Sequence, residues 1–230
     1  MFIKRSYKKE LMDDFSINDG RIGTALNELG TINKYLGGNS VTKKGIDYFL
    51  SDPDNGLDIL DIGGGGSDIL YNLCRKIKGL NFYSLDLNKF SCHYQKTNNG
   101  NNKIICADAL KLPLREKSFD LVHTSLFLHH FTEEEIIQML SCFILLSKRG
   151  VVINDLRRNI LAFIGIKLLT FLFSKSEFVK YDGPLSVKRA FIKTDLKQIL
   201  HKAGIKTYQL RRMWAFRFLL IIPASSNEQG

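Results

Sequence analysis

The hydrophobic and polar positions of this chain form short blocks that repeat through its middle. Between apolar runs, residues such as Ile69, Leu70 and Leu73 recur at the spacing of one helix face. Apolar runs separated by such helical segments predict a parallel sheet covered by helices on both faces. The runs that are typical of buried strands are 58–62, 81–86, 103–107, 119–124 and 150–155.

The segments on either side of these strands follow other patterns. Before the first strand, Ile22, Leu26 and Leu29 follow helical spacing, and this piece has too little core to be a domain of its own. After the fifth strand the rhythm breaks, and a last helix with two strands follows. We therefore expect a single domain with four parts, namely a helical cap (1–56), a ligand-binding core (57–155), a lid insertion (156–193) and a C-terminal helix with edge strands (194–222).

Composition and charge narrow the class of protein. The 230 residues include 33 Lys and Arg against 23 Asp and Glu, a net charge of +10. The cations are scattered without an RNA-binding aromatic signature, which favours a solvated basic surface over nucleic-acid binding and leaves contact with an anionic membrane as the second alternative. Four separated cysteines and a charged start without an apolar signal segment predict a cytoplasmic protein.

A glycine-rich turn is the strongest local signal. Gly63 to Gly66 lie between a predicted strand and a helix that Ser67 is expected to cap with its hydroxyl. Such a turn brings bare backbone and the positive end of a helix dipole close to a ligand. Asp86 and Asp108 end the next two strands, where carboxylates can accept from ribose hydroxyls and an adenine amino group. Together these positions indicate a nucleoside ligand.

The motifs DIGGGGS, LDLN and ADALKLPLREKSFDLVHTSLFLHHF, within residues 57–155, resemble class I S-adenosylmethionine (SAM)-dependent methyltransferases. The resemblance is strongest to the branch of the ubiquinone and menaquinone C-methyltransferases and of many small-molecule O-methyltransferases. It implies a Rossmann-like, doubly wound α/β fold with a seven-stranded, mostly parallel sheet whose last strand is antiparallel. Ser67 replaces the last glycine of the family's loop pattern.

The resemblance also assigns residues to SAM. The side chain of Asp61 and the backbone of the glycine turn would face the methionine part of SAM, and Asp86 would hold the ribose. The implied cofactor-binding residues are Asp61, Gly63, Gly64, Gly65, Asp86, Leu87, Asp108, Ala109, Thr124 and Ser125.

The catalytic candidates are His129, His130 and Asp155, which follow the fourth strand or end the fifth. An imidazole there could take a proton from an acceptor hydroxyl, and Asp155 could orient it. Because adjacent side chains are expected to diverge, only one of the two histidines is expected to act. The resemblance implies a structural role for His130, since a histidine there is common across the superfamily, and we therefore favour His129 as the base. The sequence shows no cluster of His, Asp and Glu, so no metal site is expected.

The predicted function is transfer of a methyl group from SAM to a small, fairly apolar acceptor, at a phenolic or enolic oxygen, as in natural-product pathways. The alternatives are C-methylation of a membrane quinone, N-methylation, and a SAM-binding protein without catalysis. The apolar run 160–173 is too short to span a bilayer and predicts a lid over the acceptor, with a dimer contact or an interfacial helix as alternatives. A turn is predicted at 181–184.

Overall fold

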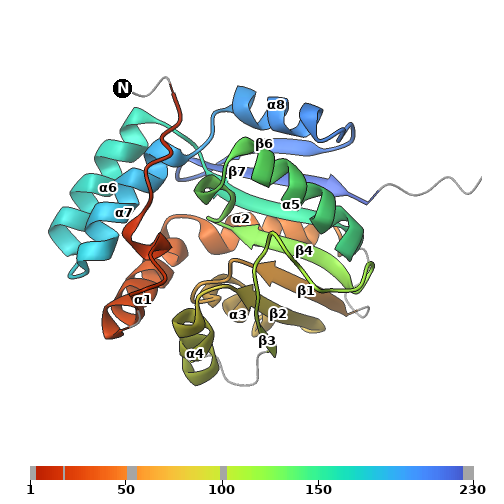
Figure 1. Cartoon of the computed structure of the whole chain (residues 1–230), viewed down its shortest axis with the longest axis horizontal. Helices are drawn as coiled ribbons and strands as arrows, with labels where there is room; N and C mark the ends of the chain where they lie inside the picture. The colour runs from red at the N-terminus through yellow and green to blue at the C-terminus, as the bar shows by residue number, and fades with distance from the viewer. Residues whose placement is uncertain (1–3, 18, 51–55, 99–102, 225–230) are drawn as a thin grey trace, which may run out of the picture.

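The computed structural model describes residues 4–17, 19–50, 56–98 and 103–224, and is built on one seven-stranded sheet (Figure 1). The strand order is β3-β2-β1-β4-β5-β7-β6, with β7 antiparallel to its neighbours β5 and β6 and the other pairs parallel. The predicted fold class is therefore confirmed. The strands are β1 (Leu57–Ile62), β2 (Leu80–Asp86), β3 (Lys103–Cys106), β4 (Phe119–Ser125), β5 (Ser147–Leu156), β6 (Gln209–Met213) and β7 (Arg217–Pro223).

Helices cover both faces of the sheet, because successive side chains on each strand point to opposite faces. On β1, Leu60 packs in the cluster formed with α5 and α8, whereas Ile59 packs in the cluster formed with α2 and α3. The helices on these faces and beside β3 are α2 (Gly38–Asp47), α3 (Asp68–Cys74), α4 (Lys89–Asn98), α5 (Glu133–Leu146) and α8 (Lys193–Lys202).

A second group of helices gathers beside the sheet, on the left in Figure 1. These are α1 (Gly20–Tyr35), α6 (Ile160–Phe173) and α7 (Glu177–Arg189), and the short 3-10 helix η1 (Leu11–Asp13) packs on α7. Buried Ala25 of α1 packs against Phe178 and Val179 of α7. The segments before β1 and after β5 thus meet each other in space.

Two local predictions differ from the structure. The turn expected at 181–184 is wrong, because these residues lie inside α7, which Ser176 caps. Gly183 packs closely against Ile166 of α6, and this tertiary packing outweighs the local Gly-Pro signal even though Pro184 donates no helical hydrogen bond. Ser67 does precede α3, but its hydroxyl makes no cap bond.

The start of α5 is capped. Thr132 and Glu135 form a reciprocal capping box there. Within the described residues, no helix is both long and apolar enough to cross a membrane. Residues 225–230 lie outside the described residues.

The N-terminal strap, residues 4–13, runs along α7 (red in Figure 1). The backbone N–H of Ser6 donates to the Lys188 carbonyl at 3.1 Å. The backbone N–H groups of Leu11 and Met12 donate to the two carboxylate oxygens of Asp182 at 2.7 and 3.0 Å. These bonds bring the start of the chain next to the loop that follows β4.

Candidate active site

A cavity of about 830 Å³ lies where the loops after β1, β2 and β4 meet α1, α6, α7 and the strap. His129 and His130 line it, and Asp155 lies behind His129. Thr124 does not line it, because alternate side chains of β4 point to opposite faces and Ser125 is the one that faces the cavity. The predicted cofactor residues that line the cavity are Asp61, Gly63, Gly64, Gly65, Asp86, Leu87, Asp108, Ala109 and Ser125.

The glycine turn has little room for side chains. Gly63 has a φ of +70°, and a Cβ there would collide with the ring of Phe127. A Cβ on Gly64 would collide with the hydroxyls of Ser67 and Ser84, which hydrogen-bond each other at 2.7 Å. Glycine is therefore required at both positions for the turn to close against its neighbours.

Ser67 serves this turn and not the helix. Its φ of +52° turns the side chain back, so that its hydroxyl donates to Asp61 Oδ2 at 3.4 Å and pairs with Ser84. The predicted cap bond is thus replaced by a buried polar contact under the glycine turn.

Asp61 is positioned by a buried chain of hydrogen bonds. Its Oδ1 lies 2.7 Å from His123 Nδ1, and His123 Nε2 lies 3.0 Å from the hydroxyl of Thr42. Thr42 also accepts from the side-chain amide of Asn154 at 3.0 Å. Since that hydroxyl can then donate to Nε2, the Nδ1–H of His123 is directed at Asp61. His123 thus orients a residue that is a candidate to contact the cofactor.

Asp86 connects β2 to the glycine turn. Its Oδ2 accepts from the backbone N–H of Gly65 and its Oδ1 from that of Asn88, both at 2.8 Å. Burial raises the pKa of this carboxyl, and the two N–H bonds offset part of that effect. Each oxygen keeps a second lone pair for ligand hydroxyls. The neighbouring side chain of Leu87 is exposed and can pack on a ring.

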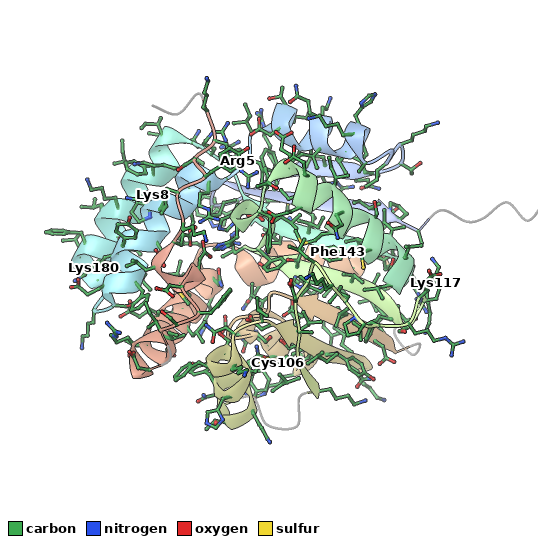
Figure 2. The ribbon with its side chains drawn as sticks, viewed as in Figure 1. Arg5, Lys8, Cys106, Lys117, Phe143 and Lys180 are labelled. Atoms are coloured by element: carbon green, nitrogen blue, oxygen red, sulfur yellow. The ribbon has the colours of Figure 1, made fainter. Side chains whose placement is uncertain are left out.

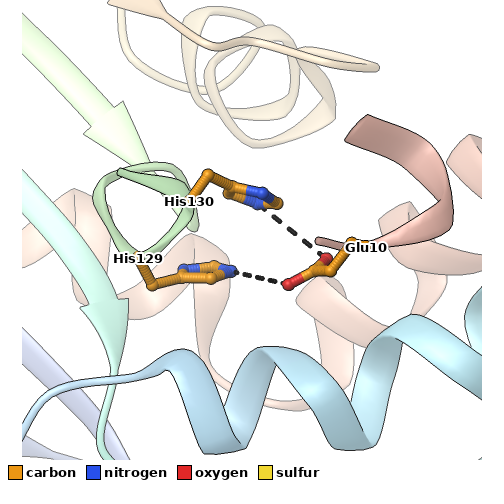
Figure 3. A group of neighbouring side chains, drawn as sticks. All are labelled: Glu10, His129 and His130. Atoms are coloured by element: carbon orange, nitrogen blue, oxygen red, sulfur yellow. Dashed lines mark ion pairs between the residues drawn. The ribbon is translucent and has the colours of Figure 1, made fainter. Parts of the chain in front are cut away.

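The acceptor side of the cavity contains a cluster of His129, His130 and Glu10 (Figure 3). Both histidines lie on the 3-10 helix η2 (Leu128–His130), and their ring centroids are 4.3 Å apart. Their Nε2 atoms approach Glu10 at 3.7 and 4.0 Å. The expectation that adjacent histidines diverge is therefore wrong, because the tight turn of η2 directs both rings to one carboxylate.

A carboxylate lies behind each ring. His129 Nδ1 is 2.7 Å from Asp155, and His130 Nδ1 is 2.7 Å from Asp13. Asp155 thus has the contact expected of a residue that orients a base. Glu10 and Asp13 are not predicted as site residues from the sequence, because they lie far from the histidines along the chain. The expectation that no cluster of His and Glu exists is wrong for the same reason.

Burial and the neighbouring charges together determine the pKa values of the carboxyls in and behind this cluster. Burial raises the pKa of Glu10 to about 7. Burial also acts on Asp155, but the facing His129 ring outweighs it and holds the pKa of that carboxyl below its ordinary value. His129 is almost fully buried, and its Nε2 has no hydrogen-bond partner.

Two arginines fix η2 in place. Arg189 of α7 donates to the carbonyls of Lys8, His129 and His130. It also pairs with Asp13 at 2.7 Å. Arg5, labelled at the top of the strap in Figure 2, donates to the His129 carbonyl at 2.8 Å. The backbone of the histidine turn is thus held from both the strap and α7.

Comparison with known proteins identifies a domain in this chain. Residues 60–153 match the family model described as a methyltransferase domain. This match begins within β1, ends within β5 and includes all ten residues that the sequence assigns to the cofactor. No curated protein sequence matches the chain.

Solved structures share the fold at low identity. A SAM-dependent methyltransferase from Aquifex aeolicus has a TM-score of 0.62 and 15% identity, covering 87% of this chain and 97% of the other. Magnesium protoporphyrin IX methyltransferase from Synechocystis PCC 6803, with bound S-adenosylhomocysteine (SAH), has a TM-score of 0.61 and 18% identity, covering 93% of this chain and 100% of the other. Human N-acetylserotonin methyltransferase, in complex with SAM, has a TM-score of 0.64 and 15% identity, covering 95% of this chain and 59% of the other.

The family match and the shared fold agree with the glycine turn and the carboxylates at the strand ends. Residues 60–153 thus match a methyltransferase domain, and the chain has the fold of solved SAM-dependent methyltransferases, which agrees with the activity that the sequence predicts.

Proposed function

We propose that the enzyme transfers the methyl group of SAM to an oxygen atom of a small, largely apolar acceptor. The observation that carries this proposal is that one cavity contains both the glycine turn with Asp86 and the histidine cluster. One side suits a nucleoside with an amino-acid tail, and the other offers a proton acceptor. Two reactants held in a single cavity can reach near-attack geometry, which supplies much of the rate of a displacement.

The cofactor side is assigned as follows. Asp86 accepts from the ribose hydroxyls, Leu87 packs on the adenine, and Asp108 with Ala109 contacts the adenine edge. Asp61 and the backbone of Gly63 to Gly65 face the amino-acid part. In support, these residues line the cavity, and the glycine turn leaves no space for side chains that would keep a ligand away.

The acceptor side is largely apolar. Leu29 of α1, Ile166 and Leu169 of α6, and Phe131 after η2 line it, so an apolar acceptor gains free energy by leaving water there. SAM supplies an electrophilic methyl carbon, whose bonding pair returns to sulfur as the new carbon–oxygen bond forms. His129 lines the cavity, and its Nε2, which has no hydrogen-bond partner and points toward Glu10, is the atom that takes the hydroxyl proton.

The test of the cofactor site is calorimetric titration with SAH. The wild-type protein is expected to bind, and Asp86→Ala to bind about 100-fold more weakly, because charge-assisted bonds to two hydroxyls are lost. Asp120→Asn is the matched control, since Asp120 also accepts from a backbone N–H, that of Asp58 at 2.9 Å, but outside the cavity. No binding by the wild type, or equal binding by Asp86→Ala, would contradict the proposal.

A second candidate function, C-methylation of a membrane quinone, is favoured by the exposed face of α6. Leu161 and Ile166 of this helix line the cavity, so α6 joins the cavity to the surface. An apolar patch of this kind on a helix is typical of an interaction surface. Lys167, Lys175 and Lys180 are exposed on or near it, and Figure 2 labels Lys180 on this side. The large apolar side chains that α6 exposes are Ile160, Leu161, Ile164, Leu168, Phe171, Leu172 and Phe173.

Co-sedimentation with phosphatidylglycerol vesicles tests this alternative. If α6 contacts the membrane, the wild type sediments with the vesicles and Phe171→Ser/Phe173→Ser loses at least tenfold of that binding, because two exposed rings no longer enter the lipid. Tyr35→Ser, on α1, removes an equally exposed ring elsewhere and should leave sedimentation unchanged. If the wild type stays in solution, the quinone alternative is wrong and the O-methyl transfer proposal is unaffected.

A further inference from the structure

The cluster of Glu10, His129 and His130 has the composition and orientation of a metal-binding site. One ligating atom from each of the three residues lies within 4.8 Å of the others. In Figure 3 the two rings from η2 and the carboxylate from the strap point toward a common position. They come from two segments that the fold brings together at the cavity, so their convergence is not a consequence of local sequence.

The hydrogen bonds behind the rings fix which nitrogen faces that position. Each Nδ1 lies 2.7 Å from a carboxylate, Asp155 for His129 and Asp13 for His130. A neutral imidazole that donates its Nδ1–H to a carboxylate presents the Nε2 lone pair, and metal-bound histidines are commonly held in this way. His129 Nε2 is buried, faces Glu10 and has no hydrogen-bond partner, which is a costly state for a polar atom.

The spacing also suits an ion better than direct hydrogen bonds. Glu10 lies 3.7 Å from His129 Nε2 and 4.0 Å from His130 Nε2, both beyond hydrogen-bond distance. Ligand atoms about 2.1 Å from a tetrahedral ion lie roughly 3.4 Å apart. Small rotations of the Glu10 side chain close the difference of a few tenths of an ångström.

We propose that Glu10, His129 and His130 bind a divalent transition-metal ion of the zinc type at the acceptor side of the cavity. Two imidazoles and one carboxylate suit Zn²⁺ or Co²⁺, whereas Mg²⁺ and Ca²⁺ prefer oxygen ligands. Three protein ligands leave a coordination position open toward the cavity, as in catalytic zinc sites.

This inference rests on the proposed function in one respect, which is the role of the ion. An ion there would bind the acceptor oxygen and lower its pKa, so that the hydroxyl proton leaves to water or to Glu10 and the oxygen attacks as an anion. His129 would then hold the ion and would not itself take the proton. Asp13 and Asp155 are positioning residues in this arrangement, since they act through the imidazoles.

Metal binding is tested without any acceptor. The full-length protein is stripped with a chelator, dialysed and titrated with Co²⁺, and Zn²⁺ is then added in competition. We expect one equivalent of Co²⁺ to give visible absorption bands of a low-symmetry site with nitrogen and oxygen ligands, and Zn²⁺ to remove them. Glu10→Gln and His130→Ala should weaken binding at least tenfold, and Asp13→Asn about tenfold.

The controls separate this site from other sources of ion binding. His201→Ala removes an exposed histidine on α8 and should bind as the wild type does. An intense near-ultraviolet thiolate band would assign the ion to a cysteine and overturn the proposal, as would equal affinity of the wild type and Glu10→Gln. Circular dichroism melting of each variant identifies any loss of metal binding that is caused by unfolding. Glu10→Gln and Asp13→Asn are conservative changes at two different positions, so the test does not depend on a single variant.

Failure of this inference is distinguishable from failure of the proposed function. SAH binding, measured on the metal-stripped protein, depends on Asp86 and the glycine turn, and is expected to persist without Co²⁺ or Zn²⁺. SAH binding without metal binding would leave the methyl transfer proposal intact with His129 as the base.

Discussion

Replacing His129 by asparagine is expected to lower the rate of methyl transfer by about 10²- to 10⁴-fold, the usual contribution of a general base. The asparagine amide occupies the place of Nδ1 and can still donate to Asp155, which lies 2.7 Å from that nitrogen in the wild type. The variant keeps this donor but lacks the far side of the ring with Nε2, the nitrogen that points toward Glu10. The loss is expected whether this atom takes the proton directly or holds an ion.

The measurement uses labelled SAM and an acceptor found by screening extracts for products heavier by one CH₂ group. SAH binding by His129→Asn should match that of the wild type, which shows that the cofactor side is intact. His201→Asn, a substitution at an exposed histidine, serves as the control. Unchanged turnover in His129→Asn would remove His129 from the mechanism, and absence of any transfer by the wild type would favour a non-catalytic SAM-binding protein.

Replacing Arg189 by methionine is expected to destabilise the protein by about 3–5 kcal/mol, because breaking a buried ion pair leaves an uncompensated charge. Arg189 is almost fully buried and pairs with Asp13 at 2.7 Å. The methionine would also leave the carbonyls of Lys8 and His130 without their donor. Urea unfolding followed by circular dichroism measures the change in the free energy of unfolding.

Arg21→Met is the control, because it removes an ion pair of the same length that lies on the surface. Arg21 and Asp19 also form an ion pair of 2.7 Å, but both side chains are exposed, at 66% and 47%. Water screens this pair, so its loss should leave the free energy of unfolding nearly unchanged. If the two substitutions lower the free energy of unfolding equally, burial does not determine the contribution of Arg189. Its contacts with Asp13 and Lys8 would then not be what holds the strap on α7.

The sequence predicts the sheet, and it also predicts most of the residues that line the cavity around the glycine turn, because both depend on local patterns. An apolar run followed by Gly63 and Gly64 specifies a strand and a close backbone turn within a few residues. Asp86 could be placed beside that turn without a structure, because the carboxyl ends of neighbouring parallel strands converge at one edge. Of Thr124 and Ser125, only Ser125 lines the cavity, and the alternation of side chains at the end of β4 decides between them.

The acceptor side could not be predicted in this way, because its residues meet only in the folded chain. Asp13 reaches His130 across 117 positions and Arg189 across 176. No spacing rule connects such residues. Glu10 lies in a charged N-terminal segment, and no sequence pattern distinguishes it from the other charged residues there. The turn predicted at 181–184 failed for a related reason, since the packing of Gly183 on α6 is not visible in the local sequence.

The strap also has a consequence for synthesis of the enzyme. Residues 4–13 leave the ribosome long before α7, yet Arg5 bonds the Arg189 carbonyl 184 positions later. Contacts of such long range are costly to close early and form late in folding. We therefore expect nascent chains that already contain the SAM-binding strands to lack an organised histidine cluster. Methylation competence would then appear late, once α7 has emerged, so a partly made enzyme would not consume its cofactor.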